Sequence, residues 1–174
     1  MDASEAPIPA DVVSASGFAA FYDAHAAIVY GYLVRLCGGD TRRAEELAQQ
    51  TWFELVDQIA AGHTERARVP WLLTVARSRY LDTWRREHRA ARAVRVAWTN
   101  PDPVDPWEPA RTDVLDHLAG LDTDQRLVLV MRYIDELSVA EIAEAIGRTT
   151  TATHSLLARG RRELRNRLEG GRDA

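Results

Sequence analysis

Four of the chain's seven prolines fall between residues 100 and 109, in the sequence NPDPVDPWEP. Proline has no backbone N–H to donate and its ring clashes with the preceding helical turn, so no helix can pass through this segment. The segment also carries three acidic residues and no basic one. Because prolines stiffen a chain into extended structure, the sequence predicts a stiff, acidic linker at 98–110 between two small folded parts.

Helical periodicity dominates on both sides of this linker. No alternating strand pattern or hairpin-type turn appears. We therefore expect an all-α fold of two small helical domains, preceded by a disordered N-terminus at 1–16, with the first domain at 17–97 and the second at 111–170. The expected helices cover residues 18–36, 41–61, 70–96, 112–121, 123–136, 138–146 and the run that follows.

The end of the chain has the pattern of a helix-turn-helix, of the winged-helix-like class. Ser138 and Glu141 have the spacing of a capping box, and Gly147 ends the helix that they begin. The run 148–168 holds six arginines against one acid. Recognition helices contact base edges with their N-terminal residues, so the later arginines are interpreted mainly as a solvated or positioning face. The candidate DNA contacts are Arg148, Thr149, Thr150, Thr151, His154, Ser155 and Arg159.

A second basic segment lies in the expected helix 70–96, where arginines alternate with Tyr80 and Trp84. Arginine neutralises phosphates and aromatic rings stack on unpaired bases, so this helix is a candidate for binding single-stranded DNA. The alternative is that Tyr80 and Trp84 belong to the core face together with Leu73 and Ala76. Both interpretations leave outward the arginines of this helix, which include Arg77, Arg79, Arg85, Arg86 and Arg89.

The composition of the chain argues against several classes of protein. The net charge is −4, yet the 174 residues alternate in sign, with basic blocks at 58–99 and 148–174. No apolar run approaches the roughly 18 residues of a membrane span, and the start MDASEAPIPAD does not have the cationic and apolar regions of a signal peptide, so we expect a protein that is not exported. Cys37 is the only cysteine, which fits a reducing cytoplasm. The five histidines show no metal-binding spacing, so we expect no catalytic residues, no metal and no cofactor.

At this point the chain resembles the extracytoplasmic-function (group IV) sigma factors of bacterial RNA polymerase, over nearly its whole length after residue 16. The segment AEELAQQTW (44–52) is similar to the helix that docks on core polymerase, and WLLTVARSRYLDTWRR (71–86) is similar to the helix that opens the minus-ten element. The segment 121–164 is similar to the domain that binds the minus-thirty-five element. Three motifs in this order, around a proline-rich linker, are far more specific than one helix-turn-helix.

The resemblance implies a role for each motif. The first domain would be sigma region 2 and the second sigma region 4, with the contacts of residues 148–159 made at the minus-thirty-five element. Core polymerase would bind Glu45, Glu46, Gln49, Gln50, Trp52 and Phe53. The minus-ten element would be contacted by His63, Arg66 and Arg68 of the loop 62–69, where relatives capture a flipped base, and by Arg77, Arg79, Tyr80, Trp84, Arg85, Arg86 and Arg89 of the following helix.

The implied partners are core RNA polymerase, promoter DNA in double- and single-stranded form, and an anti-sigma factor, with no insertion into a membrane. Some positions depart from the family pattern, among them Ser78 in place of asparagine, His154 in place of a basic residue and Gly160 in place of alanine. Three alternatives stay open: a nuclease, a stand-alone helix-turn-helix regulator, and a sigma-like protein that has lost promoter recognition.

Overall fold

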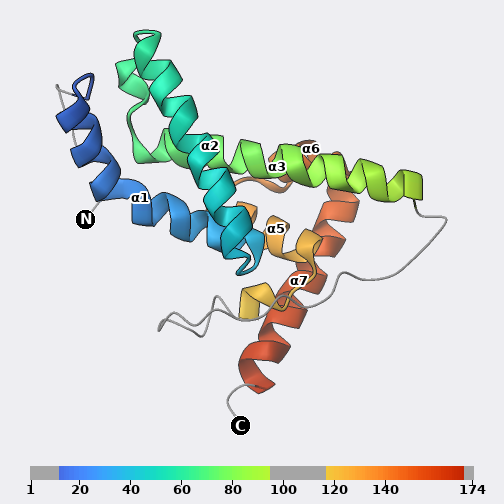
Figure 1. Ribbon diagram of the computed structural model, residues 1–174. Helices are drawn as coiled ribbons and strands as arrows, with labels where there is room; N and C mark the ends of the chain where they lie inside the picture. Colours follow the sequence, from blue (N-terminus) through green and yellow to red (C-terminus); the bar gives the residue numbers. More distant parts are fainter. Residues whose placement is uncertain (1–11, 95–116, 171–174) are drawn as a thin grey trace. The chain divides into compact units, whose positions relative to one another are not determined.

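A computed structural model describes residues 12–94 and 117–170, apart from the side chains of residues 89–94 and 170. The predicted linker at 98–110 lies outside these residues. Within them every regular element is a helix, which confirms the all-α prediction (Figure 1). The helices are α1 (Ala15–Cys37), α2 (Thr41–Ala60), the short η1 (Thr64–Arg66), α3 (Val69–Val94), α5 (Thr123–Tyr133), α6 (Val139–Ile146) and α7 (Thr150–Gly170). Residues 117–119 are also helical.

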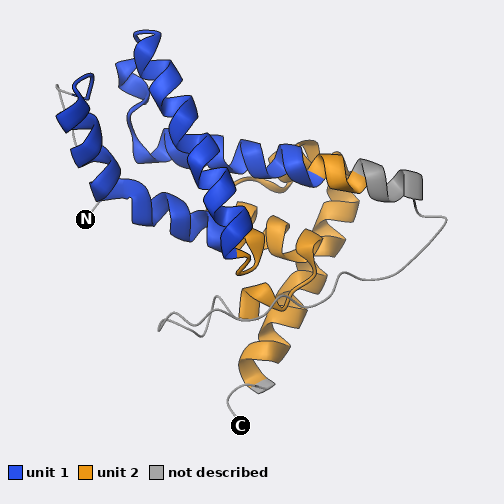
Figure 2. Cartoon of the chain, in the orientation of Figure 1, with its two compact units in different colours: residues 1–34, 41–84 blue, residues 35–40, 85–174 orange. Residues whose placement is uncertain are grey.

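The chain divides into two compact units, shown in different colours in Figure 2. The first unit comprises residues 1–34 and 41–84, and the second comprises residues 35–40 and 85–174. The division therefore runs through α3, after Trp84, whereas the predicted domain boundary lies in the linker. None of the helices in the described part of the chain is long and apolar enough to cross a membrane.

The core of the first unit is built from one face of each of its three long helices. Fully buried side chains recur at helical spacing on every helix. The buried residues are Val29, Tyr32 and Leu33 on α1, Ala44, Leu47 and Leu55 on α2, and Leu72, Ala76 and Tyr80 on α3. Thr51 is also fully buried, and its hydroxyl donates to the carbonyl of Leu47 at 2.8 Å, so its polar atom stays satisfied.

In the second unit, α7 packs on both α5 and α6. All residues of α5 from Arg126 to Met131 are buried, which makes α5 the central helix of this core. Its neighbours contribute Ile142, Ala143 and Ile146 from α6, and Thr153, Leu156 and Leu157 from α7. Where α7 crosses α5, a Cβ on Gly160 would lie 3.3 Å from Gln125 Cβ and Leu129 Cδ1. The close approach of these two helices explains why glycine is accommodated at a position inside a helix.

The predicted starts of α5 and α6 and the predicted end of α6 are confirmed, whereas α5 ends at Tyr133, three residues before its predicted end. The Asp122 side chain accepts from the N–H of Asp124 at 2.9 Å and so caps α5. Ser138 and Glu141 form both bonds of the capping box at the start of α6. Gly147 ends α6 with φ of 63°, a left-handed conformation that glycine adopts without strain.

At the N-terminus the structure differs from the sequence analysis. Helix α1 begins at Ala15, inside the segment predicted to be disordered. The reason is local, because the Ser14 hydroxyl accepts from the N–H of Gly17 at 3.0 Å and so caps the first turn. The prediction was therefore wrong for Ala15 and Ser16, and residues 1–11 lie outside the described part of the chain.

Arg126 is a buried cation that sequence reasoning missed. Its side chain is buried, and its Nε and Nη1 atoms donate to four backbone carbonyls, at Leu36, Leu118, Ala119 and Leu121, over 3.1–3.5 Å. A buried charge is tolerated when its donors are satisfied in this way. Gly38, with φ of +68°, leaves the space that the guanidinium occupies. Arg126 therefore holds together the segments of the second unit that meet at residues 35–40 and 118–121.

Candidate polymerase and nucleic-acid interfaces

The residues predicted to contact upstream DNA lie on an exposed face at the start of α7. Thr149 caps the helix, since its hydroxyl accepts from the N–H of Ala152 at 3.2 Å. The buried residues Thr153, Leu156 and Leu157 define the opposite face, toward α5 and α6. The predicted contacts are all exposed, namely Arg148, Thr149, Thr150, Thr151, His154, Ser155 and Arg159. The short side chains at 149–151 keep this end of the helix narrow enough for a close approach to a groove.

Arg148 belongs to a small polar cluster of the second unit. Its Nη2 atom lies 2.5 Å from Oδ2 of Asp124, and the other oxygen of Asp124 lies 2.9 Å from Nε2 of His88. The Arg148 side chain keeps 36% of its surface exposed, whereas Asp124 keeps only 16%. A partly exposed ion pair contributes little to stability, so the main consequence of the pair is to restrict the direction of the guanidinium.

Two aromatic residues of α3 do not lie where DNA contact requires. Tyr80 is 1% exposed and Trp84 is 4% exposed, so neither ring offers a face on which a base can stack. The guanidinium of Arg43 lies over the Tyr80 ring, 5.4 Å from its centroid. The structure therefore corrects the stacking interpretation of these rings and favours the alternative, in which they form part of the core.

The arginines of α3 are distributed around the helix. Arg86 is exposed, whereas Arg77, Arg79 and Arg85 are half-buried. The Nε and Nη2 atoms of Arg85 donate to the carbonyl of Ala145, within the second unit, at 3.1 and 2.6 Å. The Arg89 side chain lies outside the described part of the chain.

The loop between α2 and α3 presents the other predicted minus-ten residues. His63 and Arg68 are exposed and Arg66 is half-buried. The loop is ordered by η1, in which the N–H of Arg66 donates to the carbonyl of His63 at 3.2 Å, and by Ala67, which is 1% exposed. The Arg66 guanidinium lies 6.0 Å from the centroid of the Trp71 ring at the start of α3. These contacts hold a compact loop with basic and imidazole side chains on its surface.

Most of the residues predicted to bind core polymerase line one open groove in the first unit. The groove has a volume of about 820 Å³ and lies between α1 and α2. Trp52 lines the groove, and its ring lies 4.8 Å from that of Tyr22 and 6.1 Å from that of Phe21, measured between centroids. The α2 side of the lining is formed by Glu45, Ala48, Gln49, Trp52, Phe53 and Val56.

Exposed apolar side chains make this groove unusual for a protein surface. Phe53 is 68% exposed, Val56 is 43% exposed and Tyr22 is 41% exposed. A cluster of large exposed apolar groups bordered by polar ones is typical of a protein–protein interface. The predicted residues Glu46 and Gln50 are exposed but do not line the groove, and Glu46 pairs with Arg42 at 3.4 Å.

Two comparisons of sequence bear on these surfaces. The family models described as Sigma-70 region 2 and Sigma-70, region 4 match residues 21–90 and 111–164. The chain is 31% identical over 160 residues to the ECF RNA polymerase sigma factor SigL of Mycobacterium tuberculosis, covering 86% of this chain and 88% of the relative. It is 34% identical over 166 residues to SigK of Mycolicibacterium vanbaalenii, covering 88% and 83%. The chain belongs to the extracytoplasmic-function sigma factors.

The fold of the chain is similar to that of a solved structure. The sigma factor RpoE of Bartonella quintana, in complex with the anti-sigma factor NepR, matches with a TM-score of 0.54. The two sequences are 18% identical, and the match covers 87% of this chain and 96% of that chain. At this identity the likeness shows the helical fold alone.

Membership in the family favours an initiation factor over a nuclease or a stand-alone regulator. The sigma factor directs promoter-specific initiation of transcription by RNA polymerase, and sigma factors are initiation factors, not classical enzymes. A stand-alone helix-turn-helix regulator accounts for the match to region 4 but not for the match to region 2, so that alternative has no support. Within the described residues, no group of three or more histidine, cysteine, aspartate or glutamate side chains is arranged to hold a metal ion.

Proposed function

We propose that the sigma factor binds its partners through three separate surfaces. The groove of α1 and α2 docks on core polymerase, the loop 62–69 and the arginines of α3 contact the minus-ten element, and the start of α7 contacts the minus-thirty-five element. The domains responsible would be region 2 at 17–97 and region 4 at 111–170, joined by the acidic linker at 98–110. We also propose that the protein acts in the cytoplasm and that an anti-sigma factor holds it inactive, as the family resemblance implies.

One observation carries this proposal. The two predicted surfaces differ in their chemistry. The residues predicted to dock on polymerase lie at an apolar, aromatic groove in the first unit, whereas those predicted to contact upstream DNA lie on an exposed, threonine-rich face of α7. The apolar groove is suited to a protein partner. The α7 face, which has Arg148 and Arg159 at its two ends, is suited to a groove of DNA. The two surfaces support different partners for one chain.

The direct test is run-off transcription. Purified sigma factor added to core polymerase should produce discrete transcripts from a subset of fragments of the genome that encodes it, whereas core polymerase alone should not. Sequencing the transcript ends would then define the promoter class. If no fragment of that genome supports initiation, the proposed function is wrong.

Arg148 tests the assignment of α7 to the minus-thirty-five element. Because a guanidinium in contact with DNA contributes about 1 to 2 kcal/mol, Arg148→Ala should weaken binding of the reconstituted holoenzyme to its promoter about tenfold. The measurement is a titration of holoenzyme on labelled promoter DNA at fixed salt. The matched control is Arg165→Ala, since Arg165 is exposed on the C-terminal half of the same helix. Equal losses from both changes would contradict the assignment.

A further inference from the structure

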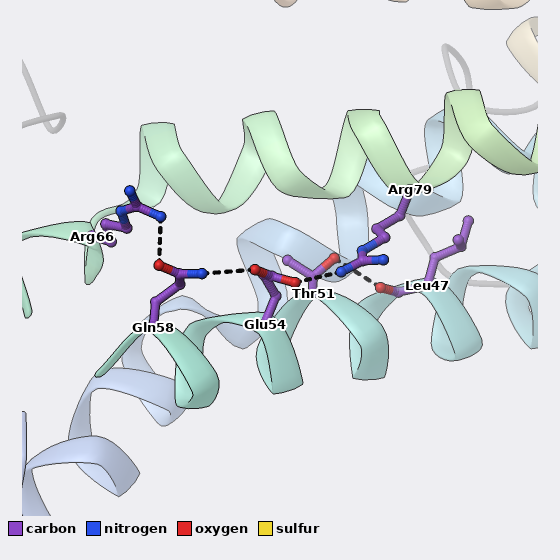
Figure 3. A network of polar contacts seen from close by, with 6 residues as sticks. All are labelled: Leu47, Thr51, Glu54, Gln58, Arg66 and Arg79. Carbon is purple, nitrogen blue, oxygen red and sulfur yellow. Dashed lines mark hydrogen bonds and ion pairs between the residues drawn. The ribbon is translucent and has the colours of Figure 1, made fainter. Parts of the chain in front are cut away.

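A chain of polar contacts connects α2 to the loop 62–69 and to α3 (Figure 3). At its centre is Glu54, whose Oε1 accepts from Nε2 of Gln58 at 2.9 Å and whose Oε2 accepts from Nη2 of Arg79. The Oε1 atom of Gln58 in turn accepts from Nη1 of Arg66. Glu54 and Gln58 thus connect two arginines that are predicted to contact the minus-ten element, although neither residue was itself predicted to be functional.

The charges on either side fix the orientation of the Gln58 amide. Its oxygen faces the guanidinium of Arg66 and its NH₂ group faces the carboxylate of Glu54. In the reversed orientation the NH₂ group would face a cation and the oxygen an anion, so both contacts would be repulsive. Hydrogen bonds between charged and neutral groups in such a chain strengthen one another. Glu54 therefore determines which end of the amide Arg66 meets.

Gln58 also holds the loop at a second point. Its backbone carbonyl accepts from the N–H of His63 at 2.9 Å, while its side chain accepts from Arg66. The residue therefore binds both the position before η1 and the last residue of η1. These two contacts fix how the loop leaves α2 and where it turns back toward α3.

The partners remain accessible from the loop surface. The Arg66 side chain is 39% exposed and the Arg79 side chain is 41% exposed, whereas Glu54 is 27% exposed. The cations thus present their outer surfaces, and the carboxylate that anchors Arg79 lies deeper. Glu54 and Gln58 are thus placed to hold the two arginines, while the arginines stay accessible to a partner.

We propose that Gln58, oriented by Glu54, is a positioning residue that sets the conformation of the loop 62–69 and thereby the base preference at the minus-ten element. The proposal rests on the proposed function, in which this loop contacts that element. Gln58 itself touches no DNA and acts through Arg66 and the backbone of His63. Removing its side chain breaks the contact between Arg66 and α2 and leaves only one of the two Gln58 contacts, the backbone bond to His63.

Two readouts on Gln58→Ala test the proposal. In the free chain, amide hydrogen exchange at Arg66 and Ala67 should become about tenfold faster, because local opening becomes easier. In the holoenzyme, transcription from a promoter library randomised at the minus-ten element should show a ratio of preferred to disfavoured base that is about tenfold lower, with core polymerase binding unchanged within about twofold. The matched control is Asp57→Ala, since Asp57 is the exposed neighbour on α2 and should change neither readout.

A reciprocal exchange separates positioning from general packing. Gln58→Glu alone puts two carboxylates side by side, and Glu54→Gln alone removes the anion between two cations, so each should reduce base discrimination. The double variant restores one amide and one carboxylate in the opposite order, and discrimination should return to within about twofold of the parent chain. Failure of the double variant to recover would overturn the proposal.

The remaining outcomes are also decisive. If loop exchange does not change in Gln58→Ala, the residue does not position the loop. If exchange accelerates while base preference is retained, the loop does not set that preference, and the proposal is again wrong. A parent chain that shows no minus-ten preference at all would contradict the proposed function itself, an outcome visible before any variant is compared.

Discussion

Replacing Trp84 by alanine is expected to lower the free energy of unfolding by about 3 to 5 kcal/mol. Trp84 is 4% exposed near the middle of α3, and truncation of a buried tryptophan removes a large apolar surface and leaves a cavity. The free energy of unfolding of a domain of this size is only about 5 to 15 kcal/mol, so the change should remove a substantial part of it. The measurement is urea denaturation followed by circular dichroism.

Two companion variants show whether burial is the cause. Trp84→Phe keeps an aromatic ring in the core and should cost less than the alanine change, whereas Ser78→Ala on the exposed side of α3 should stay within about 0.5 kcal/mol of the parent. A stable Trp84→Ala protein that binds core polymerase but fails to open promoters would contradict the core position. That result would return the ring to the role of a stacking platform for single-stranded DNA.

The helix ends were predictable from the sequence because their causes are local. The capping box of Ser138 and Glu141, the left-handed Gly147 and the cap at Asp122 each depend on residues within one turn. The start of α1 was misplaced although Ser14 supplies a cap of the same kind. Its signal was missed because the surrounding acidic, proline-bearing segment has the composition of a disordered tail.

The position of a residue around a helix was harder to predict than the helix itself. Tyr80 and Trp84 share a stripe with Ala76, yet arginines flank them closely enough that periodicity alone allowed either a core or a contact role. In α7, Leu168 is 40% exposed although Leu156 and Leu157 on the same helix are buried. The burial of these residues depends on where neighbouring helices end, and the apolar pattern of one helix carries no information about that.

The polar contacts of Glu54 and Gln58 could not be predicted from the sequence for the same reason. Glu54 and Gln58 have the ordinary i, i+4 spacing of a solvated helix face. Only the fold brings Arg79, 25 residues later in the chain, to the same carboxylate. Buried Arg126 likewise bonds to Leu36, 90 residues earlier. Long-range polar contacts of this kind leave no local pattern by which a reader of the sequence can find them.

The second large effect is expected at Phe53. Phe53→Asp should raise the Kd of the sigma factor for core polymerase at least about 100-fold, equivalent to about 2.7 kcal/mol. The change removes an aromatic side chain that is 68% exposed on the groove of α1 and α2, and puts a charge beside Trp52 and Val56. Because Phe53 is exposed in the free chain, its stability should change by less than about 1 kcal/mol. Fluorescence anisotropy of labelled full-length protein titrated with core polymerase measures the affinity.

Ile28 provides the matched control for this surface. It is 48% exposed on α1 but does not line the groove, so Ile28→Asp should leave core binding within about twofold. Equal losses from the two changes would show that docking is not confined to the groove. Transcription adds an independent criterion, because a defect in docking alone is overcome by mass action. Raising the concentration of the Phe53→Asp protein above its new Kd should therefore restore promoter-specific initiation with an unchanged base preference, whereas a defect in promoter contact would persist at saturation.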